Sequence, residues 1–232
     1  ITDLIAKSLA FIILPIYLYL MPKEEFGEFG FLFTVSITSS TLLSLSFYSI
    51  LIKDLSKQEN IDLHKEFFSS LFIFAIIFNF ILFIMLALIE SYFNLFSDFF
   101  SLDAYKIEKI ILVGIIIILN IISLFQYSLL LIRKKTIDIC LFIFLKFLFS
   151  NLISIFSLYY FDTDSVLIRL YSLAISEFIL ILFIFFLLKE NYLINKINTF
   201  YLLKSIKIAA PLILATFLSL IMITIDRKLI QY

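Results

Sequence analysis

The sequence predicts an all-α polytopic membrane protein, and its composition, its apolar runs and the charge of its loops all indicate this class. Of the 232 residues, 63% are apolar and 16% are charged, against about 45–50% and about 25% in a typical soluble domain. The apolar residues gather in runs of the length that a bilayer span needs, about 20 residues. One water-soluble core could not hide this surplus, because a domain of this size still exposes much of its surface.

Seven membrane spans are expected, with short polar breaks that are typical of a compact helical bundle. The spans cover residues 4–21, 29–52, 67–89, 109–132, 139–160, 166–188 and 207–225. The loops after spans two, four and six each carry three Lys or Arg residues, whereas the loops after spans one, three and five carry at most one. Because cytoplasmic loops are enriched in these residues, we expect the N-terminus to be cytoplasmic.

Span one combines a basic residue with a proline. Lys7 follows Asp3 at a spacing of four residues, which favours a local ion pair near the cytoplasmic end of the helix. The alternative is that Lys7 extends to the membrane interface. Pro15 removes a helix hydrogen bond and tends to bend the helix. The bend either serves a helix that moves during transport or is a static kink.

Spans two and four carry polar faces, whereas span three shows only Asn79. Span two has a face of threonines beside a face of serines, namely Thr34, Thr38, Thr41, Ser36, Ser40 and Ser44. Span four places Asn120, Ser123 and Tyr127 at i, i+3 and i+7, and therefore on one face. Such side chains either hold neighbouring helices together or line a common cavity.

Spans five and six contain the ionisable residues that lie deepest in the membrane. Lys146 and Asn151 lie on span five with a stripe of serines, and Arg169 and Glu177 lie on span six. An ionisable side chain at this depth costs about 2.5–3.5 kcal/mol and usually faces the bundle interior. An antiparallel hairpin around residues 161–165 places Lys146 level with residue 180, about 4.5 Å along the helix from Glu177. We therefore predict an ion pair that either neutralises both charges or can release Lys146 to a lumen.

Polar faces on spans one, two, four, five and six are better explained by one hydrophilic cavity than by scattered contacts between helices. The residues expected to bind substrate in this cavity are Lys146, Arg169, Glu177, Lys7, Asn120 and Asn151. Glu177 is also a candidate for coupling transport to a cation, and Pro15 and Pro211 are candidates for gating.

Span seven resembles span one and predicts a repeat. Residues 7–20 and 207–220 match at six of fourteen positions when offset by 200, and each segment contains a proline, Pro15 or Pro211. Parallel repeats of this kind occur in transporters. We therefore expect residues 1–190 to form a six-helix N-terminal lobe, residues 191–206 a cytoplasmic amphipathic linker, and residues 207–232 the first helix of a second lobe, so that the chain is the N-terminal part of a larger transporter.

Several classes of function do not fit the sequence. The chain carries 18 basic and 18 acidic residues, so it lacks the basic field expected of a nucleic-acid-binding protein. Cys140 is the only cysteine, and no ligand spacing indicates a metal site. There is no phosphate-binding loop of the G-x-x-x-x-G-K-[ST] type. No cofactor is expected.

The segment MPKEEFGEFG at residues 21–30 resembles a signature of the Wzx-type polysaccharide and O-antigen flippases. Pro22, Glu25, Phe26 and Gly27 match that signature. The end of span two is also similar to the family, although Ser46 stands where the family often has glycine. Residues 210–230 resemble the seventh helix of the family, with Pro211 early and Asp226 late. Asp226 is a further candidate for coupling by this resemblance, unless it pairs with a neighbouring basic residue.

The resemblance implies two six-helix lobes around a cationic cavity in the bacterial cytoplasmic (inner) membrane. It implies flipping of an undecaprenyl-diphosphate-linked oligosaccharide by alternating access, with membrane lipids and the polysaccharide polymerase machinery as further partners. A cation-coupled multidrug antiporter of the same superfamily is an alternative, although span one has no acidic residue at mid-membrane. A membrane-embedded glycosyltransferase or polysaccharide polymerase is a second alternative, but such enzymes usually need catalytic groups in a long outer loop.

Overall fold

The structure, a computed structural model, confirms the all-α class. It describes residues 2–55, 61–93, 106–133, 136–161, 163–188 and 197–230, and within these residues it contains helices and no strand. The helices in chain order are α1 (Thr2–Leu20), α2 (Lys23–Leu43), α3 (Phe47–Leu55), α4 (Ile61–Phe93), α6 (Lys106–Arg133), α7 (Thr136–Tyr160), α8 (Ser165–Leu188) and α9 (Thr199–Ile230).

Six of these helices contain segments that are long and apolar enough to cross a membrane. The segments are Lys23–Leu43, Lys65–Met85, Ile107–Ile132, Thr136–Tyr160, Ser165–Leu187 and Thr199–Ser219. In α1 the apolar stretch Phe11–Leu20 is shorter. A helix satisfies its backbone hydrogen bonds internally, which is what a chain in lipid requires, and large apolar side chains such as Phe11, Phe156 and Phe186 are exposed on the outside of the bundle.

The expected second span is not one continuous helix. It is divided into α2 and α3 by a break at residues 44–46, where Leu45 and Ser46 have φ angles of 52° and 54°. These angles lie in the left-handed region, which an α-helix cannot contain. Asn79 of α4 donates from Nδ2 to the carbonyl oxygen of Leu43 at 2.9 Å. The isolated polar residue of span three therefore satisfies a backbone group at the end of α2.

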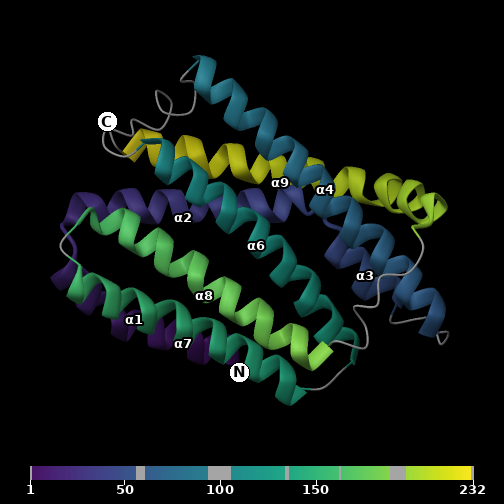
Figure 1. The fold of residues 1–232 in the computed structure, drawn as a ribbon, viewed down its shortest axis with the longest axis horizontal. Helices are drawn as coiled ribbons and strands as arrows, with labels where there is room; N and C mark the ends of the chain where they lie inside the picture. The colour runs from purple at the N-terminus through teal and green to yellow at the C-terminus, as the bar shows by residue number, and fades with distance from the viewer. Residues whose placement is uncertain are drawn as a thin grey trace.

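Helix α8 is central to the bundle, because it runs between α6 and α7 and packs against both (Figure 1). Helix α1 packs against α7, and α2 packs against α6 and α8. On the other side, α9 lies across α2, α3 and α4 (Figure 1). One apolar core joins α3, α4 and α6 around Phe47, Leu71 and Phe125, and a second joins α1, α2, α6 and α8 around Phe29 and Leu170.

The N-termini of α2, α6 and α8 are tied together by charged side chains at one end of the bundle. Lys109, which is 2% exposed, lies 2.8 Å from Glu28 Oε1 and 3.1 Å from Asp164 Oδ2. Asp164 also caps α8, because its Oδ1 accepts a hydrogen bond from the Leu167 amide at 3.0 Å. Glu25 accepts hydrogen bonds from the amide and the hydroxyl of Ser165. We call these five residues (Glu25, Glu28, Lys109, Asp164 and Ser165) the end cluster.

Candidate functional site: a polar cavity among five helices

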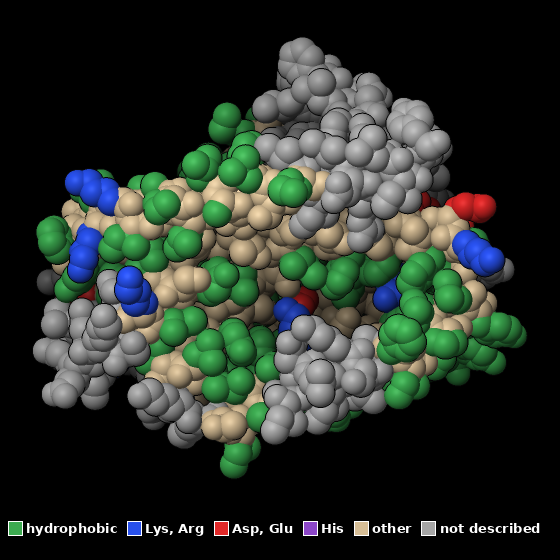
Figure 2. Space-filling view, turned by 180° about the vertical axis from the view of Figure 1, so that it is seen from behind, with side chains coloured by type: hydrophobic (Ala, Val, Ile, Leu, Met, Phe, Trp, Pro, Cys, Tyr) green, Lys and Arg blue, Asp and Glu red, His purple; other side chains and the backbone are tan. Residues whose placement is uncertain are grey.

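A cavity of about 840 Å³ lies among α1, α2, α6, α7 and α8. Its polar lining residues are Tyr17, Ser40, Thr41, Asn120, Ser123, Tyr127, Lys146, Ser150, Asn151, Arg169 and Glu177. The space-filling view shows a recess in one face of the molecule with basic and acidic side chains inside it (Figure 2). The five helices are those whose polar faces predicted a common cavity, and among the described residues α4 adds nothing to the lining.

Lys146 and Glu177 form the ion pair that the hairpin between α7 and α8 predicts. Lys146 Nζ lies 2.7 Å from Glu177 Oε1, and it also donates to Asn120 Oδ1 at 3.3 Å. Glu177 Oε2 accepts a hydrogen bond from the Ser123 hydroxyl at 2.8 Å. The Glu177 side chain is 7% exposed and that of Lys146 is 38% exposed. The carboxylate is thus nearly buried and held by two partners, while the Lys146 side chain is partly exposed.

Arg169 is held by aromatic rings rather than by a carboxylate. The central carbon of its guanidinium group lies 3.4 Å from the centre of the Tyr17 ring and 4.0 Å from that of Phe29. Its Nη1 lies 3.8 Å from the sulfur of Met21, a weak acceptor. Its Nε is buried and has no hydrogen-bond partner, and no carboxylate among the described residues forms an ion pair with it.

The aromatic part of the Arg169 environment comes from α1 and α2. Phe26, which belongs to the segment that resembles the flippase signature, has its ring centre 5.8 Å from the guanidinium carbon. Tyr17 is fixed from α7, because its hydroxyl donates to Asn151 Oδ1 at 3.0 Å. Asn151 in turn donates to the carbonyl of Phe147 at 2.7 Å. The sequence gives no local signal that Tyr17 and Phe29 contact Arg169, because an aromatic residue in an apolar helix looks like any core residue. Phe26 stands out only through its match to the signature.

Many of the hydroxyl groups bond to the backbone of their own helix. Ser40 and Thr41 of α2 both donate to the carbonyl of Ile37, at 2.7 and 3.0 Å. On α8, Ser172 and Ser176 donate to backbone carbonyls at 2.8 Å, and neither serine lines the cavity. The cavity face of α8 consists instead of Arg169, Leu173 and Glu177, at i, i+4 and i+8.

Four of the candidate residues are not brought into the cavity by the described part of the chain. Lys7 and Asp226 lie on α1 and α9, but their side chains are outside the described residues. Pro15 and Pro211 are exposed, and α1 and α9 continue through them. The binding, coupling and gating roles considered for these four residues stay predictions.

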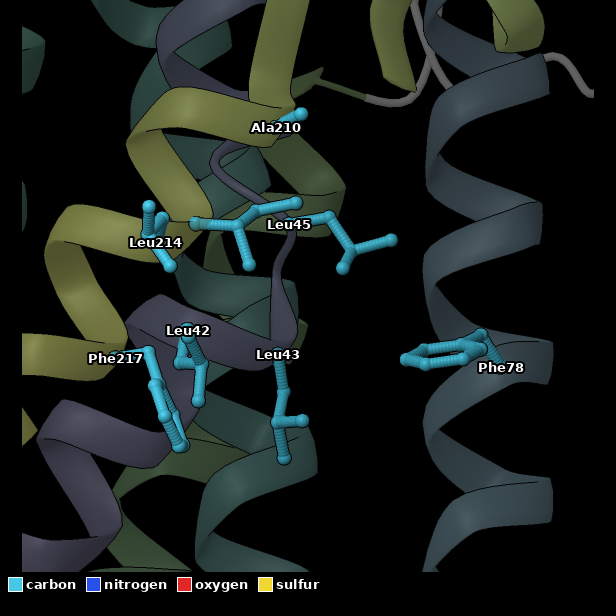
Figure 3. Close-up of a pocket in the computed structure, with 8 residues that line it drawn as sticks. Leu42, Leu43, Leu45, Phe78, Ala210, Leu214 and Phe217 are labelled. Carbon is cyan, nitrogen blue, oxygen red and sulfur yellow. The ribbon is translucent and has the colours of Figure 1, made fainter. Parts of the chain in front are cut away.

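A second, apolar pocket of about 480 Å³ lies between the end of α2, α4 and α9. Figure 3 shows Leu42, Leu43 and Leu45 facing Phe78 on one side and Ala210, Leu214 and Phe217 on the other. Its described lining contains no polar side chain, so it offers no group that could bind a charged or hydroxylated ligand.

Comparisons with known proteins give one match. The model of the family described as "Polysaccharide biosynthesis protein" matches residues 1–232. No curated protein and no solved structure matches the chain. The family model therefore covers every helix that lines the cavity.

Proposed function

Because the chain belongs to the polysaccharide biosynthesis protein family, which is the family of the Wzx-type flippases, we propose that it flips a lipid-linked oligosaccharide. The substrate is undecaprenyl-diphosphate-linked oligosaccharide, and the membrane is the bacterial cytoplasmic membrane. In this proposal the chain is a transporter and not an enzyme.

The observation that carries the proposal is a polar cavity among helices that, apart from α1, are long and apolar enough to span a membrane. Its volume of about 840 Å³ lies within the range of about 300–1,000 Å³ that is usual for small-molecule sites. Amide, hydroxyl and charged groups from five helices converge on it, and such groups, which are costly within a membrane, usually mark a substrate or ion pathway. The cavity can therefore replace water around the sugar and diphosphate groups while the polyprenyl chain stays in lipid.

The charges inside the cavity suit the same substrate. Lys146 lines the cavity and its side chain is 38% exposed, so it can approach an anionic group of the substrate. In the orientation expected from the loop charges, the end cluster lies on the periplasmic side. Opening and closing of the cavity by alternating access would involve the second lobe that the repeat at residues 207–220 predicts.

A cation-coupled antiporter is the second candidate, and Glu177 is the observation that favours it. Its carboxylate is nearly buried within the cavity, as expected of a group that binds a proton or a metal cation. Both of its oxygens are already engaged by Lys146 and Ser123, which favours the flippase. Resistance of cells to cationic drugs that depends on Glu177 would favour the antiporter.

The proposed function is tested by measuring the amount of surface polysaccharide exported by cells that depend on this protein. We expect Lys146→Ala to lower the export of polysaccharide severalfold while the protein still inserts into the membrane. Lys23→Ala, which removes an exposed charge outside the cavity, serves as the control and should leave export unchanged. Normal export by the Lys146→Ala protein at equal abundance would contradict the role of this cavity.

A further inference from the structure

We propose that Arg169 is the oxyanion-binding residue of the cavity, and that it binds either the diphosphate or a sugar carboxylate of the substrate. This inference rests on the proposed function, and it assigns the position where the negative charge of the substrate is bound. The sequence alone names Lys146 and Arg169 together as candidate substrate-binding residues, and the contacts in the structure distinguish them.

The first argument is the pairing of the basic side chains inside the bundle. Lys109 has two carboxylate partners and Lys146 has one, at distances of 2.7 to 3.1 Å. Arg169 has none among the residues that the structure describes, and its Nε has no hydrogen-bond partner at all. Buried charges are normally paired, so this guanidinium group lacks a counter-anion that a bound ligand can supply.

The second argument is the way in which Arg169 is held. The rings of Tyr17 and Phe29 lie against the guanidinium group at 3.4 and 4.0 Å, which stabilises its charge without neutralising it. Tyr17 is itself fixed by its hydrogen bond to Asn151. Rings that contact the guanidinium group leave its N–H donors as the groups that can bind an anion, and these donors match two oxygens of a phosphate or carboxylate.

The third argument is the separation of Arg169 from the ion pair. Arg169 and Glu177 both line the cavity and are eight residues apart on α8, which corresponds to about 12 Å along the helix. An anion bound at Arg169 therefore lies toward a different depth of the cavity from the ion pair, and Glu177 keeps its two partners, Lys146 and Ser123. An anion can therefore bind at Arg169 without breaking the Lys146–Glu177 ion pair.

Binding of two anionic probes to the purified full-length protein in detergent tests this inference. The probes are farnesyl diphosphate for the diphosphate and glucuronic acid for the sugar carboxylate, with glucose as the neutral reference. We expect the wild-type protein to bind at least one anionic probe, and Arg169→Ala to weaken that binding at least tenfold. If Arg169→Ala loses binding of farnesyl diphosphate, the diphosphate is the anion that Arg169 binds. If it loses binding of glucuronic acid, the anion is the carboxylate of an acidic sugar.

Two variants separate anion binding from folding. Arg169→Lys keeps the positive charge but lacks the two-pronged donor group, so it should fold and still bind the probe severalfold more weakly than the wild type. Lys23→Ala removes an exposed charge at the start of α2 and should bind normally. The inference is overturned if neither anionic probe binds the wild type, or if the folded Arg169→Lys and Arg169→Ala proteins bind the probes as the wild type does. It is also overturned if these variants lose binding of glucose to the same extent as binding of the anionic probes.

The inference and the proposed function can fail separately. If export depends on the protein while the Arg169 variants bind both probes normally, the inference alone is wrong. If Arg169 binds a probe but cells that lack the protein export polysaccharide normally, the proposed function is wrong and the binding position stands.

Discussion

At the scale of single residues, the Lys146–Glu177 ion pair is the contact whose removal is most informative. Glu177→Leu leaves the ammonium group of Lys146 without its carboxylate, and losing one partner of a buried pair costs about 3–5 kcal/mol. Because Lys146 is 38% exposed, we expect a loss of stability at the lower end of that range. The double variant Lys146→Met with Glu177→Leu should recover most of it, because no charge is left unpaired.

Thermal unfolding in detergent measures both variants against the wild type. A midpoint that falls clearly for Glu177→Leu and is largely restored in the double variant agrees with a coupled pair. Two substitutions whose effects simply add would show that the two side chains do not stabilise each other.

This ion pair could be predicted from the sequence, whereas the environment of Arg169 could not. The pair lies on two consecutive antiparallel helices, so counting residues from the hairpin fixes the relative depth of Lys146 and Glu177. Arg169 instead contacts Tyr17 and Phe29, which are 152 and 140 residues away in the chain. Which helices become neighbours over such a separation depends on the packing of the whole bundle and leaves no local pattern.

At the scale of helices, the break between α2 and α3 places a serine in a backbone conformation that favours glycine. Ser46 has φ 54°, and a residue with a side chain pays about 1–2 kcal/mol there. Ser46→Gly should therefore raise stability by up to about 1 kcal/mol, since the greater freedom of glycine in the unfolded chain offsets part of the gain. Thermal unfolding of the purified protein measures the change.

Ser44→Gly is a matched control for this substitution. Ser44 is also a buried serine, but its φ is −69°, in the right-handed helical region. Glycine there offers no relief of strain, so the same assay should show a lower midpoint. If Ser46→Gly lowers the midpoint as much as Ser44→Gly does, the backbone at Ser46 is not strained.

The sequence predicted the positions of the helices but not this break. Residues 44–46 contain neither glycine nor proline, which are the usual signals of an interruption, and the apolar run continues through them. The residue that holds the break, Asn79, lies on another helix. Only the folded arrangement therefore shows why α2 ends where it does.

The end cluster makes a second prediction at the scale of helices. Lys109→Met leaves the carboxylates of Glu28 and Asp164 without their shared partner, so we expect a loss of about 3 kcal/mol or more in unfolding free energy. Asp164→Asn removes one charge but keeps a side-chain oxygen that can cap α8, so its effect should be smaller. Equal effects of the two substitutions on thermal unfolding would show that Lys109 does not join the three helices.

At the scale of the whole molecule, the orientation expected from the loop charges can be measured. With Cys140 replaced by alanine, a single cysteine is introduced at Thr163, between α7 and α8, or at Lys53, near the end of α3. We expect a membrane-impermeant maleimide to label the Thr163→Cys protein in cells whose outer surface is accessible. It should label the Lys53→Cys protein only after the cytoplasmic membrane is opened. The reverse pattern would place the N-terminus outside.

The lining of the cavity also differs chemically from one side to the other. Ser40 and Thr41 donate their hydroxyl hydrogens to the carbonyl of Ile37, so these two groups of α2 offer lone pairs to anything in the cavity. On α7 and α8, Lys146 and Arg169 can only donate, and the oxygens of Glu177 are already engaged by Lys146 and Ser123. A ligand that fits both sides must therefore carry hydroxyl donors toward α2 and anionic acceptors toward α7 and α8. A sugar joined to a phosphate has this two-sided pattern, and a hydrophobic cation does not.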